Sequence, residues 1–161
     1  DATLFADTLN GGNGADTLDG GLGNDLLTGG GAAGGADGAD TFEFSLHGST
    51  VDGGFGSNDG SDTVLDFNRA NDVLKFTDVM DVNGGGVDIT DLAASIHSIT
   101  SAGGNTTIAF ENGASVQLNG VTGGGIADVT ATTHTGAENT AIQADIEAIV
   151  NGAVAHILVS G

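Results

Sequence analysis

Aspartates that recur every nine residues, close behind glycines, are the side chains of this sequence best suited to chemistry. Asp7, Asp16 and Asp25 form one series, and a glycine stands two residues before the last two of them. Glycine adopts the positive φ angles of tight turns and lets backbone carbonyls converge without a Cβ in the way. Ca²⁺ prefers six to eight oxygen ligands, from carboxylates and carbonyls, at about 2.3–2.6 Å. The spacing therefore indicates a series of sites for a hard divalent cation.

Short strands are expected to position these aspartates, because an apolar residue follows each of them two places later. Residues 11–19 read GGNGADTLD and residues 20–28 read GGLGNDLLT, while residues 2–10, ATLFADTLN, are a degenerate earlier copy. Each copy predicts a glycine-rich turn and then a short strand whose single apolar side chain points into a thin core.

Later copies continue the pattern after interruptions. A six-residue insertion precedes a fourth copy, GADGADTFE, at 35–43, and a glycine-rich excursion over about 45–56 precedes a fifth, SNDGSDTVL, at 57–65. In the two repeating columns these copies carry Asp40 with Phe42 and Asp62 with Val64.

Two copies complete one coil, so alternate copies should stack on the same edge of a solenoid. We expect Asp7 and Asp25 on one edge, and Asp16 and Asp40 on the other. Each ion would then bridge two stacked turns, with backbone carbonyls completing its shell.

Glycine-rich turns also occur in β-hairpins and in phosphate-binding loops. Gly-Asn-Gly-Asp runs make good hairpin turns without metal, but a hairpin does not require an aspartate at a fixed nine-residue step. A phosphate-binding glycine loop needs a following Lys and a long helix, and neither follows these glycines.

The nonapeptide G-G-x-G-x-D-x-U-x, where U is a large apolar residue, resembles the repeat of the RTX (repeats-in-toxin) family of calcium-binding β-roll proteins. The resemblance implies an all-β fold, a parallel β-roll followed by antiparallel β-hairpins with one or two short helices. It implies several Ca²⁺ ions in the turns, held by the aspartates and by the carbonyls of the glycines and their neighbours. The residues expected to hold them are Asp7, Gly11, Asn13, Gly14, Asp16, Gly20, Gly21, Leu22, Gly23, Asp25, Gly29, Gly30, Asp37, Gly38 and Asp40.

Residues 62–76, DTVLDFNRANDVLKF, are similar to the D-x-x-x-D-F-x-x-x-x-D-x-I segment that closes the β-roll in RTX proteins. The resemblance carries over Asp62, Asp66 and Asp72 as ligands of the last calcium sites, with Asp59 beside them. The alternative is that acids and amides at this turn cap strands without binding an ion.

Residues 81–92, DVNGGGVDITDL, resemble the calcium loop of an EF-hand or dockerin but depart from its motif at several positions. The first, third and sixth positions fit, but glycine replaces the acid at the fifth and the terminal bidentate ligand is displaced. We expect instead that Thr90 or Asp91 caps a short helix running to about residue 99. Its buried face would carry Leu92, Ile96 and Ile99.

Residues 99–122 alternate apolar and polar side chains around a Glu-Asn-Gly turn, which predicts a β-hairpin. The inward side chains would be Ile108, Phe110, Val116 and Leu118. This hairpin is similar to the strand pair that follows β-rolls in RTX proteins, so the resemblance covers residues 2–122.

The last forty or so residues predict a helix and a terminal strand, HILV. The apolar stripe of the helix consists of Ile142, Ile146, Ile149 and Val150. RTX proteins carry an uncleaved C-terminal signal for type I secretion, and this tail would suit that role. An ordinary packed helix suits the pattern equally well.

Composition limits the partners, since 22 Asp and Glu against two Lys and Arg give a formal charge of −20. Such a surface does not neutralise nucleic acid or an anionic membrane without a bridging cation. The absence of Cys excludes disulfides and thiolate chemistry. The longest apolar stretch, near the end, is too short to span a membrane, and a start at Asp1 without Met suggests a fragment.

No enzymatic activity is expected of this chain. The two basic residues both fall in the roll-closing segment, and neither H-E-x-x-H nor G-x-S-x-G occurs. The histidines are scattered along the chain, at His47, His97, His134 and His156. An enzymatic domain could still precede this piece in its parent protein.

We therefore expect a calcium-binding β-roll with its closing segment at 1–76, a helix and hairpin cap at 77–127, and a helix and strand tail at 128–161. The predicted function is to fold on binding Ca²⁺ outside the cell, supporting type I secretion and the stability of a larger exported protein. A function of another class is calcium-dependent adhesion, surface-layer assembly or carbohydrate binding, with a second copy or a cell-surface glycan as partner. Both place the chain outside the cell or on the bacterial surface.

Overall fold

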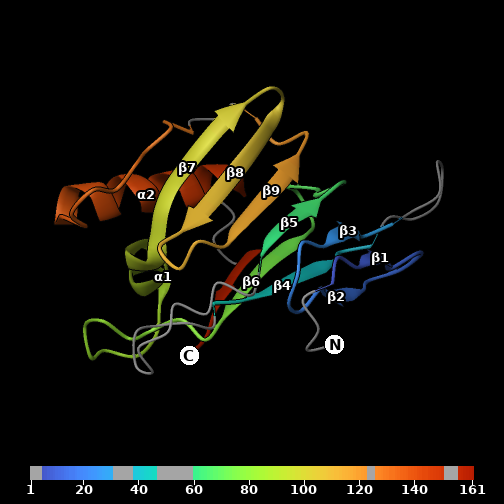
Figure 1. Ribbon diagram of the computed structural model, residues 1–161, viewed down its shortest axis with the longest axis horizontal. Coiled ribbons are helices and arrows are strands. Elements are labelled where there is room, and N and C mark those ends of the chain that lie inside the picture. Colours follow the sequence, from blue (N-terminus) through green and yellow to red (C-terminus); the bar gives the residue numbers. More distant parts are fainter. Residues whose placement is uncertain (1–4, 31–37, 47–59, 123–125, 151–155) are drawn as a thin grey trace.

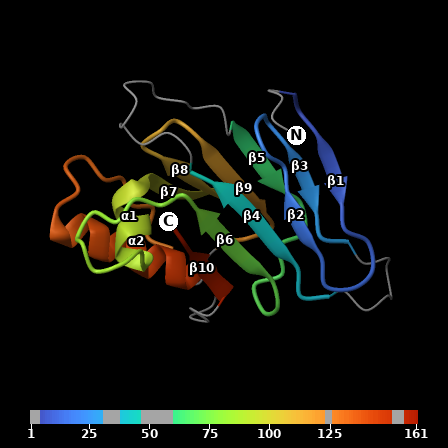
Figure 2. The same ribbon diagram turned by 90° about the horizontal axis from the view of Figure 1, so that it is seen from below.

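Strands in two facing sheets make up most of the fold, and both helices lie at the end away from β1 and β2 (Figures 1 and 2). The computed structural model describes residues 5–30, 38–46, 60–122, 126–150 and 156–161. The elements are β1 (Thr8–Asn10), β2 (Thr17–Asp19), β3 (Leu26–Thr28), β4 (Thr41–Ser45), β5 (Ser61–Val64), β6 (Val73–Thr77), α1 (Ile89–Ser95), β7 (Ile96–Ala102), β8 (Asn105–Phe110), β9 (Ser115–Asn119), α2 (Gly136–Ile149) and β10 (Ile157–Val159).

The first six strands alternate between the two sheets, which is the coil expected from the nonapeptides. β1, β3 and β5 pair in parallel in a six-stranded sheet, and β2, β4 and β6 pair in parallel in a four-stranded sheet. The apolar residue of each copy meets that of the next coil on the same side, in the rows Leu9, Leu27, Val64 and Leu18, Phe42, Leu74. The predicted β-roll is confirmed.

The predicted hairpin is also confirmed, as strands β8 and β9, with all four of its inward side chains buried. Its connection to the roll was not predicted. β9 pairs in parallel with β5, and β7 pairs with the other side of β8, so the six-stranded sheet has the order β1-β3-β5-β9-β8-β7. The core is therefore continuous, and Phe110 of β8 packs at 5.7 Å between ring centroids on Phe76 of β6.

Helix α1 departs from the sequence prediction at both ends. Its N-cap is Asp88, not Thr90 or Asp91, although Asp91 completes a reciprocal capping box as the third helical residue. The helix ends at Ser95, and the chain continues directly as β7. A β-bulge between Ile96 and Ser98 shifts the register of β7. Ile96 and Ile99, which were predicted to lie on one face of a helix, are therefore both buried in a strand.

The C-terminal region forms the predicted helix, with its apolar stripe buried, and the predicted strand. Thr135 caps α2 in a capping box with Glu138. Arg69 of the roll-closing segment donates through Nε to the carbonyl of Ile149 at 2.7 Å, and also to the carbonyl of Ala148, so its charge lies at the negative end of the helix.

Strand β10 pairs in parallel with β6 and so extends the four-stranded sheet beyond the roll. Pairing of β5 with β9 and of β6 with β10 therefore joins all three predicted segments, whose boundaries remain a prediction. Within the described ranges, no helix is long and apolar enough to span a membrane.

Candidate metal centre

The repeat aspartates stand at the starts of the strands, so they fall on two edges of the roll. Asp7, Asp25 and Asp62 lie on the edge that leads into β1, β3 and β5. The second edge leads into β2, β4 and β6 and carries Asp16, Asp40 and Asp72. The nine-residue copy sets this placement, because each half-coil consists of one turn and one short strand.

On each edge, the backbone N–H of one aspartate donates to Oδ1 of the aspartate in the next coil. The first edge has such bonds from Asp7 to Asp25 (2.8 Å) and from Asp25 to Asp62 (2.9 Å). The second edge has them from Asp16 to Asp40 (2.9 Å) and from Asp40 to Asp72 (3.0 Å). We call each series an aspartate ladder. It fixes one oxygen of each receiving carboxylate and aligns the carboxylates of successive coils.

Glycines make room for the carboxylates and carbonyls of neighbouring turns. A Cβ at Gly11 would lie 2.7 Å from Oδ2 of Asp16 and 2.6 Å from the carbonyl oxygen of Gly29, closer than real Cβ atoms come. At Gly60, whose φ is 77°, a Cβ would collide with the carbonyl of Gly23 in the neighbouring coil. Oxygen atoms are therefore concentrated where side chains are excluded.

Two ladder carboxylates have an oxygen without a hydrogen-bond donor. Oδ2 of Asp16 and Oδ2 of Asp25 are buried and have no hydrogen-bond partner, and Asp25 is only 2% exposed. Burying an ionised carboxylate is costly unless a donor or a cation compensates it. Carboxylate oxygens beside closely packed backbone carbonyls are the donor set that Ca²⁺ selects. The residues of both edges thus fit calcium ions.

Two carboxylates of the closing segment, those of Asp66 and Asp72, have donors on both oxygens. Asp66 accepts the N–H of Gly29 on Oδ1 (2.9 Å) and that of Gly30 on Oδ2 (3.0 Å). Asp72 accepts the N–H of Asp40 on Oδ1 and that of Asn68 on Oδ2 (2.8 Å). These contacts are those of the capping alternative, and calcium binding by either residue stays a prediction.

The remaining predicted ligands occupy the turns or fall outside the described residues. The turn that enters β2 contains Gly11, Asn13 and Gly14, and the turn that enters β3 contains Gly20, Gly21, Leu22 and Gly23. Gly29, Gly30 and Gly38 lie between β3 and β4. Asp37 and Asp59 lie outside the described residues. One contact that sequence reasoning missed is that of Asn24, whose Oδ1 accepts the N–H of Ser61 at 2.7 Å; its only signal was an amide directly before a repeat aspartate.

In the part of the chain that the structure describes, no three His, Cys, Asp or Glu side chains are arranged to hold a metal ion. The prediction for the turns does not require such a cluster, because backbone carbonyls can supply much of a calcium shell.

The loop at 81–91 uses its acids to bind its own backbone. Asp81 accepts N–H groups of Asn83, Gly84 and Gly86, and the donors from Gly86 and Gly84 hold the pKa of Asp81 below its ordinary value. Asp91 is fully buried and accepts the N–H of Val82 at 3.0 Å. The loop is therefore tied to α1 by hydrogen bonds.

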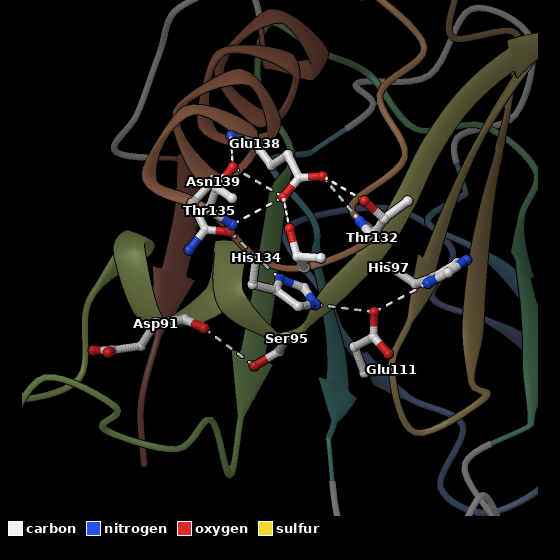
Figure 3. Close-up of polar contacts among 10 residues, drawn as sticks. Asp91, Ser95, His97, Glu111, Thr132, His134, Thr135, Glu138 and Asn139 are labelled. Atoms are coloured by element: carbon white, nitrogen blue, oxygen red, sulfur yellow. Dashed lines mark hydrogen bonds and ion pairs between the residues drawn. The ribbon is translucent and has the colours of Figure 1, made fainter.

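A polar cluster that the sequence did not predict joins three separated segments (Figure 3). Oε1 of Glu111, in the β8–β9 turn, lies 3.0 Å from Nδ1 of His97 in β7 and 3.0 Å from Nε2 of His134, which precedes α2. Burial raises the pKa of Glu111, but the hydrogen bonds from His134 and His97 and their charges outweigh this effect, so the pKa lies below its ordinary value. Beside it, Glu138 accepts the N–H groups of Thr135 and Thr132, which hold its pKa far below 4.5.

Asp145 of α2 is a buried acid outside the repeats. Its Oδ1 accepts the N–H of Ala127 at 2.6 Å, and its Oδ2 is buried without a hydrogen-bond partner. Burial raises the pKa of Asp145, and the nearby charge of Asp128 raises it further, while the N–H groups of Ala127 and Val129 oppose the shift.

Comparison with known proteins shows which family the first repeats of the roll resemble. Residues 1–33 match the family model of the RTX calcium-binding nonapeptide repeat (four copies). This N-terminal region therefore carries RTX nonapeptide repeats, which bind Ca²⁺. A solved structure similar to the chain is the AlgE6R3 subunit of the mannuronan C5-epimerase from Azotobacter vinelandii, with 28% identity, 71% of each chain covered and a TM-score of 0.31. A comparison with curated proteins finds no match.

Proposed function

We propose that this chain is a non-catalytic module that folds when it binds Ca²⁺ outside the cell, and that it thereby supports the secretion and stability of a larger exported protein. Calcium supplies the counter-charge that stacks the turns, and the stacked turns position the hairpin and the helices. Its expected location is outside the cell or on the bacterial surface.

The observation that carries this proposal is the pair of aspartate ladders with buried, unpartnered carboxylate oxygens. Each ladder brings carboxylates of successive coils together in a chain whose formal charge is −20, so stacking without a cation brings like charges together. When a site exists only in the folded chain, the free energy of ion binding becomes folding free energy.

The proposal also gives export a direction. In calcium-poor cytosol the ladders lack their ions, so the chain stays expanded and can pass a narrow type I channel. Outside the cell, sites with weak affinity of the extracellular kind, with Kd of about 10⁻⁴–10⁻³ M, fill and fold the chain. The tail at 128–161 is the segment that we propose as the secretion signal.

The first test is far-UV circular dichroism during a Ca²⁺ titration of the chain after removal of calcium with EDTA, with Mg²⁺ as the control ion. A cooperative change from disorder to sheet that Mg²⁺ does not reproduce is the expected result. A chain that is already folded in EDTA and indifferent to calcium would contradict the proposal.

Calcium-bridged assembly is the second candidate function, and the position of β1 and β2 favours it. Among the described strands, each of these is the terminal strand of its sheet, with a neighbour on one side only. Such an edge can pair with another chain. Light scattering in calcium over a range of protein concentrations separates the two functions, because assembly predicts a mass that rises with concentration and the folding module predicts a constant mass.

A further inference from the structure

The outer face of the six-stranded sheet carries no charged side chain at any of its paired outward positions. Outward positions of its strands alternate with buried ones and hold Ser, Thr, Asn and Gln, with Leu26 and two alanines as the exceptions. His97 and Glu111 lie at one end of this face, at the bulge of β7 and in the β8–β9 turn. Both helices lie on the opposite side of the sheet, the side of the four-stranded sheet (Figures 1 and 2).

The other sheet shows that this absence of charge is local. On the outward side of the four-stranded sheet, Asp19, Glu43 and Lys75 stand in one cross-strand row, and Lys75 Nζ lies 2.9 Å from Glu43 Oε1. At the strand positions that the structure describes, one of the two sheet faces thus carries no charge, in a chain whose formal charge is −20.

The neutral face is an ordered array of groups that both donate and accept hydrogen bonds. Strand pairing places six outward residues in one row across the whole sheet, namely Thr8, Leu26, Thr63, Gln117, Thr107 and Thr100. Neighbouring strands lie about 4.8 Å apart, so hydroxyls and amides repeat at that spacing along the row except at Leu26. Neighbouring side chains are already oriented, because Ser115 Oγ donates to Ser61 Oγ at 3.0 Å.

The chemistry of this face selects its occupant. A polyanion would be repelled by the charge of the whole molecule, and a cationic partner would be drawn to the acidic edges instead. An apolar partner would leave the hydroxyls and amides without hydrogen bonds. An uncharged, hydroxyl-rich polymer meets neither obstacle, because each of its hydroxyls can pair with a side chain that donates and accepts.

We propose that the outer face of the six-stranded sheet binds a neutral polysaccharide. This inference goes beyond calcium-dependent folding, since it assigns a second binding surface that is separate from both aspartate ladders.

The test is native affinity electrophoresis of the calcium-loaded chain in gels that contain dextran, laminarin, hydroxyethylcellulose or alginate. We expect at least one of the three neutral polymers to retard the chain and the anionic alginate not to do so. The double variant Thr63→Asp with Gln117→Asp puts two charges on adjacent positions of the row, and should weaken retardation by about tenfold or more.

The matched control is the double variant Thr17→Asp with Thr41→Asp, which adds the same charge at adjacent outward positions of the four-stranded sheet. It should bind like the parent chain. Circular dichroism in calcium verifies folding, and if the first double variant does not fold, Thr100→Asp with Thr107→Asp in the hairpin takes its place.

Three outcomes would overturn the proposal. They are retardation by no neutral polymer, unchanged retardation of the variants on the six-stranded sheet, and equal loss in the control on the four-stranded sheet. Because folding is followed separately by circular dichroism, a failure of glycan binding is distinguishable from a failure of calcium-dependent folding.

Discussion

At the scale of single residues, the carboxylates differ in what reaches their oxygens. Oδ1 of Asp25 accepts a backbone N–H while its buried Oδ2 has no donor. Both oxygens of Asp66 accept backbone N–H groups, and Glu111 faces two imidazoles. These environments are the basis of the roles that we propose for chemically similar groups, namely cation ligation for Asp25, capping for Asp66 and cross-linking of segments for Glu111.

Asp25→Asn should weaken calcium-dependent folding more than removal of the Asp19 charge does. The amide keeps an acceptor for the N–H of Asp7 but loses the charge and the second carboxylate oxygen, so the calcium midpoint should rise by about tenfold or more. The control is Asp19→Asn, because the Asp19 carboxylate accepts the N–H of Gly21 within its own turn. Circular dichroism during calcium titration measures both, and equal midpoints for the two variants would remove Asp25 from the proposed ligands.

Glu111 should contribute to stability in a pH window set by its lowered pKa. A carboxyl whose pKa is lower in the folded chain stabilises it fully above the unfolded value, here about 4.5, and loses this contribution as the pH falls through the folded value. Glu111→Gln should therefore destabilise the chain near neutral pH, and its difference from the parent should shrink in acid. Urea unfolding at saturating calcium over a pH series measures this difference, with Glu147→Gln on the exposed side of α2 as control. A difference that grows in acid would contradict the assignment.

At the scale of elements, the turns impose the stricter demand on sequence. Each strand of the first repeats needs one apolar side chain, whereas a turn must fit beneath its neighbour without a Cβ. Helices impose a looser demand, since both begin with ordinary capping boxes.

Gly60→Ala should destabilise the folded chain by more than about 1 kcal/mol, because its φ is positive and its Cβ would collide with the carbonyl of Gly23. Gly136→Ala, in the first turn of α2, meets no atom within 4 Å and should be neutral or stabilising by up to about 1 kcal/mol. Urea unfolding in calcium compares the two. Similar effects of both substitutions would mean that the turns are not tightly stacked.

Arg69→Ala should uncap the C-terminal end of α2 and separate it from the roll-closing segment. Loss of the charged hydrogen bonds to the carbonyls of Ala148 and Ile149 should cost about 1–3 kcal/mol. The control, Lys75→Ala, removes a partly exposed cross-strand ion pair and should cost about 1 kcal/mol or less. Thermal unfolding in calcium decides between them, and a larger effect at Lys75 would contradict the capping role.

Local sequence patterns predicted which strands and helices form better than they predicted where each element begins and ends. The nonapeptides fixed the register of the coil because turn chemistry and apolar spacing repeat together. The spacing of Ile96 and Ile99 was misread as helical, because a bulge lets a strand bury residues three apart. The cap was placed two or three residues late, since Asp88, Thr90 and Asp91 are all good capping residues and only the backbone conformation distinguishes them.

At the scale of the whole molecule, the last strands of the roll are β5 in one sheet and β6 in the other. In the roll alone, each of these strands would have an unpaired edge. β9 pairs with β5 and β10 pairs with β6, so later parts of the chain extend both sheets. Sequence alone did not show these pairings, because they depend on which edges remain open after the roll has formed. The ladders were more predictable, since stacking follows from the repeat length.

Deletion of residues 156–161 should lower the stability of the folded chain while leaving calcium binding by the repeats. It removes β10, the buried side chain of Ile157 and the backbone bond from Ser160 to Phe76. We expect a lower unfolding temperature in calcium with an unchanged ion stoichiometry, measured by calorimetry. The control is Leu158→Asp, which alters an exposed side chain of the same strand. An unchanged unfolding temperature after the deletion would show that β10 does not stabilise the sheet.

The pairing of β10 with β6 sets an order of events for any receptor that recognises residues 157–159. A receptor that reads those residues as an extended peptide competes with β6 for the same backbone groups. Under the secretion role that we propose, such a receptor binds the strand before the chain folds, and folding in calcium then withdraws the strand from the receptor. The strand at 157–159 would thus be accessible to a secretion receptor only while the chain is unfolded.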